Sequence, residues 1–347
     1  MGSAGPAGKT WPRQQNLAGN LTRQRPGSMD RDRALPTLSR RQLLALVAGG
    51  LGFGASWFGA KALSQPAGAL VNQAKPAGAP ALLAKAPANS KVQTSLRWLA
   101  TADSGSGDHK QQAVADQMAA VQRRQPVDLV ILAGDNIYND GDINKVDGAF
   151  TRPYSALLQA GVPFHAVLGN HDIRTANGDP QVAYRPFGMA GRWYNLRRGP
   201  VEFFMLDTNM NANWSQQLPW LRTSLAASKA PWKVVVGHHP IYSAGFYGND
   251  PVAQGRLGPL FKTYGVQLYI NGHEHDYERT KVIDGTTYLT LGIGGASLRP
   301  ILANGNTAAC ASVHGFVELE ASPTSLKINA WDRQGKPIDQ ASLAIKS

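Results

Sequence analysis

From residue 95 onward, short apolar runs bounded by Gly, Pro or Asp alternate with segments of helical periodicity. Such runs are typical of buried strands, and their alternation with helices favours layered α and β structure over an all-α or all-β protein. We expect one helix over 108–125, where Val114, Met118 and Val121 share a face, and another over 218–227. The expected strands are Leu96–Thr101, Asp128–Ala133, Phe164–Leu168, Glu202–Leu206, Lys233–Val236, Leu268–Ile270, Thr287–Leu291, Phe316–Leu319 and Leu326–Ala330.

The first ninety residues have a different composition from the rest of the chain. The formal net charge is +12, which alone would suggest a nucleic-acid or membrane-surface binder. However, residues 1–90 hold eleven Lys and Arg against two Asp, whereas residues 91–347 carry only +3. We therefore expect no nucleic-acid partner. The single cysteine, Cys310, excludes an internal disulfide framework and a Cys-rich zinc module.

A pair of arginines, Arg40 and Arg41, precedes eighteen uncharged residues, 43–60, and a small-x-small site at 60–62. This segment resembles a twin-arginine export signal. We interpret residues 1–62 as an extension and signal peptide, cleaved rather than kept as an anchor, and the Ala/Pro-rich residues 63–94 as a spacer. The resemblance implies transient binding to the twin-arginine translocase, a periplasmic or secreted location, and no integral membrane segment after cleavage.

Polar side chains that can bind metals follow five of the expected strands. Loops at the carboxyl ends of neighbouring strands converge on one rim in α/β proteins, so these groups are expected to lie together. We expect one domain, 95–347, to carry them. The five segments are Asp103–Gly105, Gly134–Tyr138, Gly169–Asp172, Val235–His239 and Gly272–His275.

The residue types in these segments divide between two kinds of ion. Asp103, Asp135 and a tyrosinate at Tyr138 offer the anionic oxygens that a trivalent ion prefers, together with one imidazole. A divalent ion accepts the imidazoles of His238 and His273 and the neutral amide oxygen of Asn170. A shared carboxylate, for which Asp135 is best placed, would bridge the ions as in two-metal hydrolases.

The five segments, in this order, resemble the purple acid phosphatases within the calcineurin-like metallophosphoesterases. The resemblance implies a β-sandwich of two mixed sheets flanked by helices. Most members of the superfamily have Asp-x-His in the first segment, but here Gly105 stands where the histidine would be. Tyr138 occupies the position of the iron-bound tyrosinate of purple acid phosphatases. The family pattern assigns Fe(III) to Asp103, Asp135, Tyr138 and His275, and a divalent Fe, Zn or Mn to Asp135, Asn170, His238 and His273.

The same resemblance implies hydrolysis of phosphate monoesters, in acid, by attack of a metal-bound hydroxide. His171 would contact the phosphoryl group and assist proton transfer, while Asp172 would either orient its ring or cap the loop. Small purple acid phosphatases carry a further histidine where this chain has Tyr247, so the leaving-group acid stays open among His239, Tyr242 and Tyr247. We expect His239 and Tyr247 to bind substrate.

Two alternatives remain open from the sequence. A phosphodiesterase or nucleotide pyrophosphatase could use the same ligands, because specificity depends on pocket loops rather than on the metals. A non-catalytic exported metal-binding protein would require a damaged site, whereas every ligand type is present.

Overall fold

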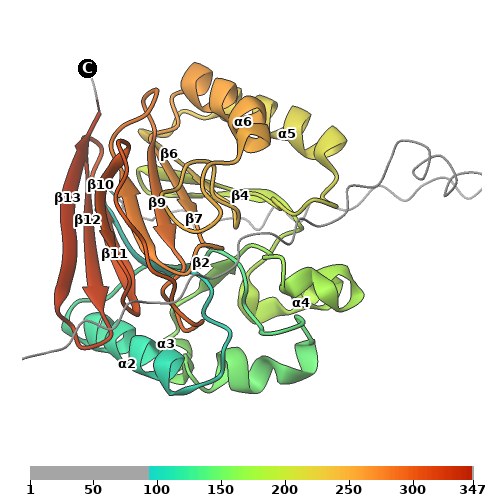
Figure 1. Ribbon diagram of the computed structural model, residues 1–347, viewed down its shortest axis with the longest axis vertical. Coiled ribbons are helices and arrows are strands. Elements are labelled where there is room, and N and C mark those ends of the chain that lie inside the picture. Colours follow the sequence, from blue (N-terminus) through green and yellow to red (C-terminus); the bar gives the residue numbers. More distant parts are fainter. Residues whose placement is uncertain (1–93, 346–347) are drawn as a thin grey trace, which may run out of the picture. The chain divides into compact units, whose positions relative to one another are not determined.

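The structure, a computed structural model, describes residues 94–345. The predicted signal peptide, and all but the last residue of the predicted spacer, lie outside this range. Within it the chain forms two mixed sheets that stack on one another, with helices on both outer sides (Figure 1). The expected fold class is therefore confirmed.

The first sheet has six strands in the order β13-β12-β11-β1-β2-β3, with β1, β2 and β3 parallel. The second has seven, in the order β10-β8-β9-β7-β6-β5-β4, with β5, β6, β7 and β9 parallel. The strands are β1 Leu96–Thr101, β2 Leu129–Leu132, β3 Phe164–Ala166, β4 Tyr194–Arg198, β5 Val201–Met205, β6 Trp232–Val236, β7 Leu268–Asn271, β8 Tyr277–Thr280, β9 Thr287–Leu291, β10 Thr307–Ala311, β11 Gly315–Ala321, β12 Ser325–Asp332 and β13 Pro337–Ala344.

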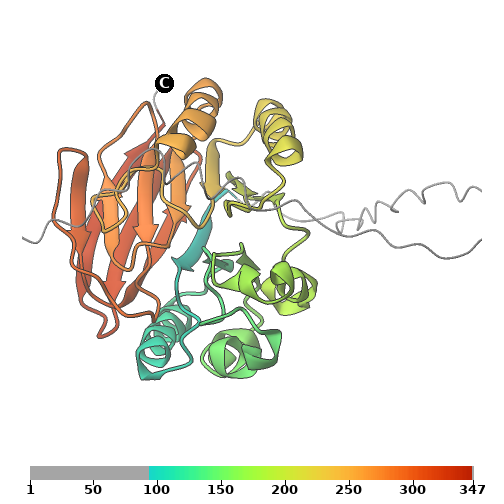
Figure 2. The ribbon, with the colours of Figure 1, turned by 45° about the vertical axis from the view of Figure 1, so that its right-hand side comes forward.

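Helices α2, α3 and α4 lie on the side of the first sheet, and α5 and α6 lie on the side of the second (Figures 1 and 2). Their bounds are α2 His109–Arg124, α3 Ser155–Gln159, α4 Asp179–Ala183, α5 Trp214–Ala227 and α6 Pro251–Tyr264. Short helical turns connect them at Ile143–Lys145, Asp147–Thr151, Asp172–Arg174, Ala176–Gly178 and Arg185–Phe187.

The central strands are apolar on both faces because each face is covered. In β1, Trp98 and Ala100 point between the sheets, whereas Leu99 packs under α2. In β6, Val234 faces the first sheet and Val235 faces the outer helices. Successive side chains of a strand alternate between faces, so a doubly covered strand reads as a continuous apolar run. This explains why these strands were visible in the sequence.

All nine expected strands are present, with ends within two residues of those predicted. The prediction missed β4, β8, β10 and β13, three of which are sheet edges. In β4 and β13 polar residues interrupt the apolar pattern, and β10 consists mainly of small residues. It also missed α6, which contains Gly255, Gly258 and Pro259. The predicted helix 218–227 begins earlier, at Trp214, because Asn213 caps it.

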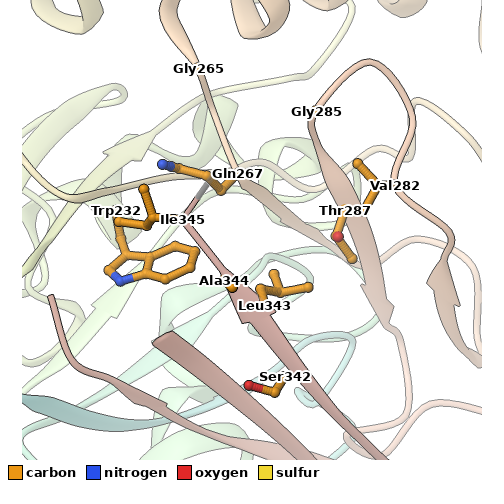
Figure 3. A pocket seen from close by; sticks show the side chains of 10 residues that line it. All are labelled: Trp232, Gly265, Gln267, Val282, Gly285, Thr287, Ser342, Leu343, Ala344 and Ile345. Carbon is orange, nitrogen blue, oxygen red and sulfur yellow. The ribbon is translucent and has the colours of Figure 1, made fainter. Parts of the chain in front are cut away.

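A hollow of about 470 Å³ lies at the amino ends of β6, β7 and β9, far along these strands from the loops that carry the metal-binding side chains (Figure 3). Its wall is mostly apolar, and its lining includes Trp232, Val282 and Leu343. No helix among residues 94–345 combines the length and the hydropathy needed to cross a bilayer.

Substitution of Trp98 tests the packing between the two sheets. Its ring meets that of Phe203, on the opposite sheet, edge to face at 5.4 Å, and it is fully buried. We expect Trp98→Ala to lower the free energy of unfolding by about 3–5 kcal/mol in denaturant titrations. The exposed control Val282→Ala should change it by no more than about 0.5 kcal/mol. A Trp98→Ala effect as small as the control's would contradict this packing.

Candidate metal centre

The seven side chains expected to bind metals all lie at one rim, where the carboxyl ends of parallel strands from both sheets meet. Asp103 follows β1, Asp135 follows β2 and Asn170 follows β3. From the second sheet, His238 follows β6 and His273 follows β7. Because the two sheets stack face to face, loops distant in the sequence converge there.

The first group of donors consists of Asp103, Tyr138 and His275. The Tyr138 hydroxyl donates to Oδ1 of Asp103 at 2.9 Å and lies 3.3 Å from Nε2 of His275. His275 Nε2 also lies 3.3 Å from Asp103 Oδ1. A carboxylate, a phenol and an imidazole therefore point at one another. All three are hard or borderline donors for a metal ion.

The second group consists of Asn170, His238 and His273. The amide oxygen of Asn170 lies 3.1 Å from Nε2 of His238 and 2.8 Å from Nδ1 of His273. One neutral oxygen and two imidazole nitrogens thus meet at a point, which is a donor set suited to a divalent transition metal.

Asp135 lies between the two groups. Its Oδ1 is 3.5 Å from His238 Nε2, in the second group. Ligand atoms of Asp103, Asp135 and His238 all lie within 4.8 Å of one another. The Asp135 carboxylate is therefore placed to touch ions held by either group.

Hydrogen bonds to backbone carbonyls fix which nitrogen of two imidazoles faces the rim. His238 Nδ1 lies 2.9 Å from the oxygen of Ala133, and His275 Nδ1 lies 2.8 Å from the oxygen of Ser297. A carbonyl can only accept, so Nδ1 carries the proton and the Nε2 lone pair is free. This arrangement orients a histidine as a metal ligand.

The electrostatics of the rim favour a bound cation. Burial, followed by the charges of Asp103 and Asp172, raises the pKa of Asp135 well above its usual range. Burial, followed by the charges of Asp103 and Asp135, also raises the pKa of the Tyr138 phenol. Burial lowers the pKa of His238 well below its usual value. Buried carboxylates close to imidazoles of lowered pKa fit the requirements of metal ions.

The backbone is strained at three of the donors. Asp103, Asp135 and His273 have φ of 54°, 53° and 69°, a region that non-glycine residues rarely adopt. Strain of this kind persists at functional sites, where the surrounding structure imposes it. In the last of the five loops the bend lies at His273, one residue after Gly272. Gly272 instead leaves room for the carboxylate of Asp103, since a Cβ there would lie 2.2 Å from Oδ2.

His171 lies at the edge of the two groups. Its Nδ1 lies 2.6 Å from the carbonyl oxygen of Asn139, and its Nε2 lies 4.0 Å from Asp135 Oδ2. Arg174 donates to that Nε2 at 3.1 Å, a contact that the sequence analysis did not anticipate. Burial is the main cause of the lowered pKa of His171.

Asp172 does not orient the His171 ring, because no hydrogen bond joins them; the loop-capping alternative matches its contacts. Its fully buried carboxylate accepts from the backbone N–H groups of Asn136, Ile137 and Gly169, at 2.8–3.1 Å. Burial raises its pKa to about 6. Asp172 thus ties the loop after β3 to the loop after β2.

Two of the three residues considered for the leaving-group acid lie at the rim. The ring of Tyr247 stacks on that of His273, with 4.5 Å between ring centres and 18° between ring planes. The centre of the His239 ring lies 4.6 Å from the centre of the His273 ring. Both line a hollow of about 280 Å³. Tyr242 packs against Tyr288 beneath the outer helices and faces away from the rim.

Thr208 and Arg299 are rim residues that the sequence analysis missed. Thr208 Oγ1 accepts from the N–H groups of His238 and His239 at 3.0 Å each and lies 2.9 Å from His239 Nδ1. Thr208 follows β5 closely, so the rule that found the other loops would also have found it. Arg299 donates to the carbonyl of His273 at 2.9 Å, and nothing in its local sequence signals this.

Comparison with known proteins gives consistent results. The calcineurin-like phosphoesterase family model matches residues 96–277. Purple acid phosphatase 7 of Arabidopsis thaliana is 30% identical over 76% of this chain and 90% of its own length. Tartrate-resistant acid phosphatase type 5 of Mus musculus is 28% identical over 72% of this chain and 90% of its own length.

Among solved structures, a purple acid phosphatase from yellow lupin (Lupinus luteus) seeds is similar with a TM-score of 0.63 and 20% identity. The likeness covers 73% of this chain and 54% of that one. The anchor in the inner membrane complex of Plasmodium is similar with a TM-score of 0.65 and 24% identity. That likeness covers 73% of this chain and 90% of the Plasmodium chain. At these identities the likeness concerns the fold.

The position of Gly105 is closed to any side chain. A Cβ there would lie 2.2 Å from the carbonyl oxygen of Asn136 and 2.5 Å from the nitrogen of Ile137. We expect Gly105→Ala to lower the free energy of unfolding by about 2–3 kcal/mol and to reduce the metal content, because the loop carrying Asp135 must move. Gly258→Ala, in open space on α6, is the matched control and should not destabilise. Wild-type stability and metal content in Gly105→Ala, by chemical unfolding and elemental analysis, would contradict this reading.

Proposed function

The chain belongs to the calcineurin-like phosphoesterases, and from this membership and the geometry of its rim we propose that it is a binuclear purple-acid-phosphatase-type hydrolase of phosphate monoesters. It is a hydrolase of the acid-phosphatase-like metallophosphoesterases, as its relatives indicate. The observation that carries the finer proposal is the position of Asp135 between two donor groups of different chemistry.

We assign Fe(III) to the group with anionic oxygens, Asp103, Tyr138 and His275, together with Asp135. A divalent Fe, Zn or Mn is assigned to Asn170, His238 and His273, again with Asp135. When bound, such a pair of ions lowers the pKa of a water and stabilises charge on the phosphoryl oxygens.

The remaining rim residues bind the phosphoryl group and handle protons in this proposal. Asn139 and Arg174 fix the His171 ring at the edge of the ligand groups. There the ring would contact a phosphate oxygen of the substrate. Thr208 has one proton and accepts two N–H groups, so it donates to Nδ1 of His239, which leaves a proton on Nε2 of that ring. We assign the Nε2–H of His239 as the hydrogen-bond donor that stabilises negative charge on the leaving oxygen.

Colour tests the metal assignment. Metal-replete protein should show a visible charge-transfer band from Tyr138 to Fe(III), and Tyr138→Phe should abolish it because the phenolate donor is removed. Tyr264→Phe, at the end of α6, is the control and should keep the band. A colourless iron-loaded wild type would contradict Fe(III) at this group.

The order of hydrolysis rates tests the substrate class. With metal-replete protein we expect an aryl phosphate monoester to be hydrolysed faster than the matching diester, and the reverse order would favour a phosphodiesterase.

We further propose that the protein is exported by the twin-arginine translocase and acts in the periplasm or outside the cell as one domain, 95–347. Three sequence features support this proposal: the twin arginines, the uncharged segment that follows them, and the small-x-small cleavage site at 60–62. Replacing Arg40 and Arg41 by lysines should leave the protein in the cytoplasmic fraction of a producing bacterium, with its signal uncleaved. Lys9→Arg is the control. Unaltered export of the double variant would contradict the twin-arginine route.

A further inference from the structure

Three large apolar side chains next to the rim are exposed to solvent. Phe246, Tyr247 and Leu302 expose 75%, 52% and 85% of their surface, whereas nearly all other large apolar residues between 94 and 345 are buried or partly buried. They line one groove of about 520 Å³, a volume in the range of small-molecule sites. The remaining lining residues are Ala244, Gly245, Arg299 and Pro300.

This groove is continuous with the candidate metal centre through Tyr247. One side of Tyr247 lines the groove, and its ring also stacks on His273 and lines the hollow that contains His239. A molecule whose phosphate lies at the metal-binding groups would therefore direct its ester group past Tyr247. The tyrosine is the wall that the two spaces share.

Buried carboxylates hold the loop that forms this wall. The N–H of Ala244 donates to Glu278 Oε2 at 2.7 Å, and the N–H of Tyr247 donates to Glu274. Both glutamates are buried, so these bonds are charge-assisted and shielded from water. Gly245 lies against the carboxyl groups, since a Cβ there would be 2.7 Å from Cδ of Glu274. The exposed rings are thus presented by a fixed backbone rather than a loose loop.

Arg299 also lines the groove, and its charge is already partnered. Its Nη1 donates to the carbonyl of His273 and lies 3.5 Å from Glu274 Oε2. The guanidinium carbon lies 4.9 Å from the centre of the Tyr247 ring and 5.8 Å from that of Phe246. A guanidinium plane and aromatic faces together offer flat contact surface.

We propose that this groove binds the ester group of the substrate and selects flat aromatic phosphate monoesters over small hydrophilic ones. The inference rests on the proposed function, because it uses the metal-binding groups as the phosphate site. Apolar and aromatic walls stabilise an aromatic ring by burial and stacking. They offer few hydrogen-bond partners to the hydroxyls of a sugar or glycerol, and the neutralised Arg299 does not attract further phosphates of a nucleotide.

The experiment compares 1-naphthyl phosphate with glycerol 3-phosphate on metal-replete protein, using the ratio of their kcat/KM values. We expect wild type to prefer the aryl ester, and Phe246→Ala and Leu302→Ala each to reduce the ratio about five- to tenfold. Both side chains are exposed, so the variants should fold. Val282→Ala, also exposed but lining the hollow of Figure 3, is the control and should keep the wild-type ratio.

Binding of non-hydrolysable benzylphosphonate and methylphosphonate, measured by calorimetry, separates this inference from the proposed function. Tighter binding of benzylphosphonate that is weakened in Phe246→Ala supports the groove, even if no ester is hydrolysed and the proposed function fails. Hydrolysis of both esters with a ratio unaffected in Phe246→Ala and Leu302→Ala overturns the groove and leaves the proposed function intact. Equal binding of the two phosphonates by wild type also overturns it.

Discussion

The rest of the site depends on the confinement of two carboxylates, Asp103 and Asp135, at a buried rim. Their ligand atoms lie within 4.8 Å of each other and of His238, and both side chains are shielded from water. Like charges this close cannot both stay ionised in a protein interior without a compensating cation. Burial, and after it the charge of Asp103, raises the pKa of Asp135 well above its usual range. Metal ions relieve this repulsion, so the same confinement that strains the protein gives the centre its affinity for cations.

Backbone geometry makes this confinement possible. Gly105 lets two rim loops touch through their main chains, and Asp172 ties the loop after β3 to the loop after β2 through buried hydrogen bonds. A histidine at position 105, as in most members of the superfamily, could not fit against Asn136. The Tyr138 hydroxyl lies instead beside Asp103 and His275, and in the proposed function it replaces that histidine as a ligand.

The second sheet contributes candidate metal-binding histidines and the wall of the proposed ester groove. Its rim loops supply His238, His239 and His273, and the buried glutamates around β8 hold the wall of the ester groove. Phosphate recognition and ester recognition thus meet at Tyr247, which touches a candidate ligand on one side and the groove on the other.

The sequence by itself determined the doubly buried strands and the residues at their carboxyl ends, because burial on both faces leaves an apolar run and a site leaves polar groups where it stops. It could not reveal edge strands such as β13, whose polar outer side hides the pattern, or α6, whose Gly and Pro resemble a loop. It left the role of Asp172 undecided, since a carboxylate beside a histidine can orient the ring or cap a loop. The tertiary structure shows that the contacts of Asp172 are those of a loop cap, and only it brought Arg299 to the rim. Contacts between residues from separate loops depend on how the two sheets stack, and no local pattern along the chain records that stacking.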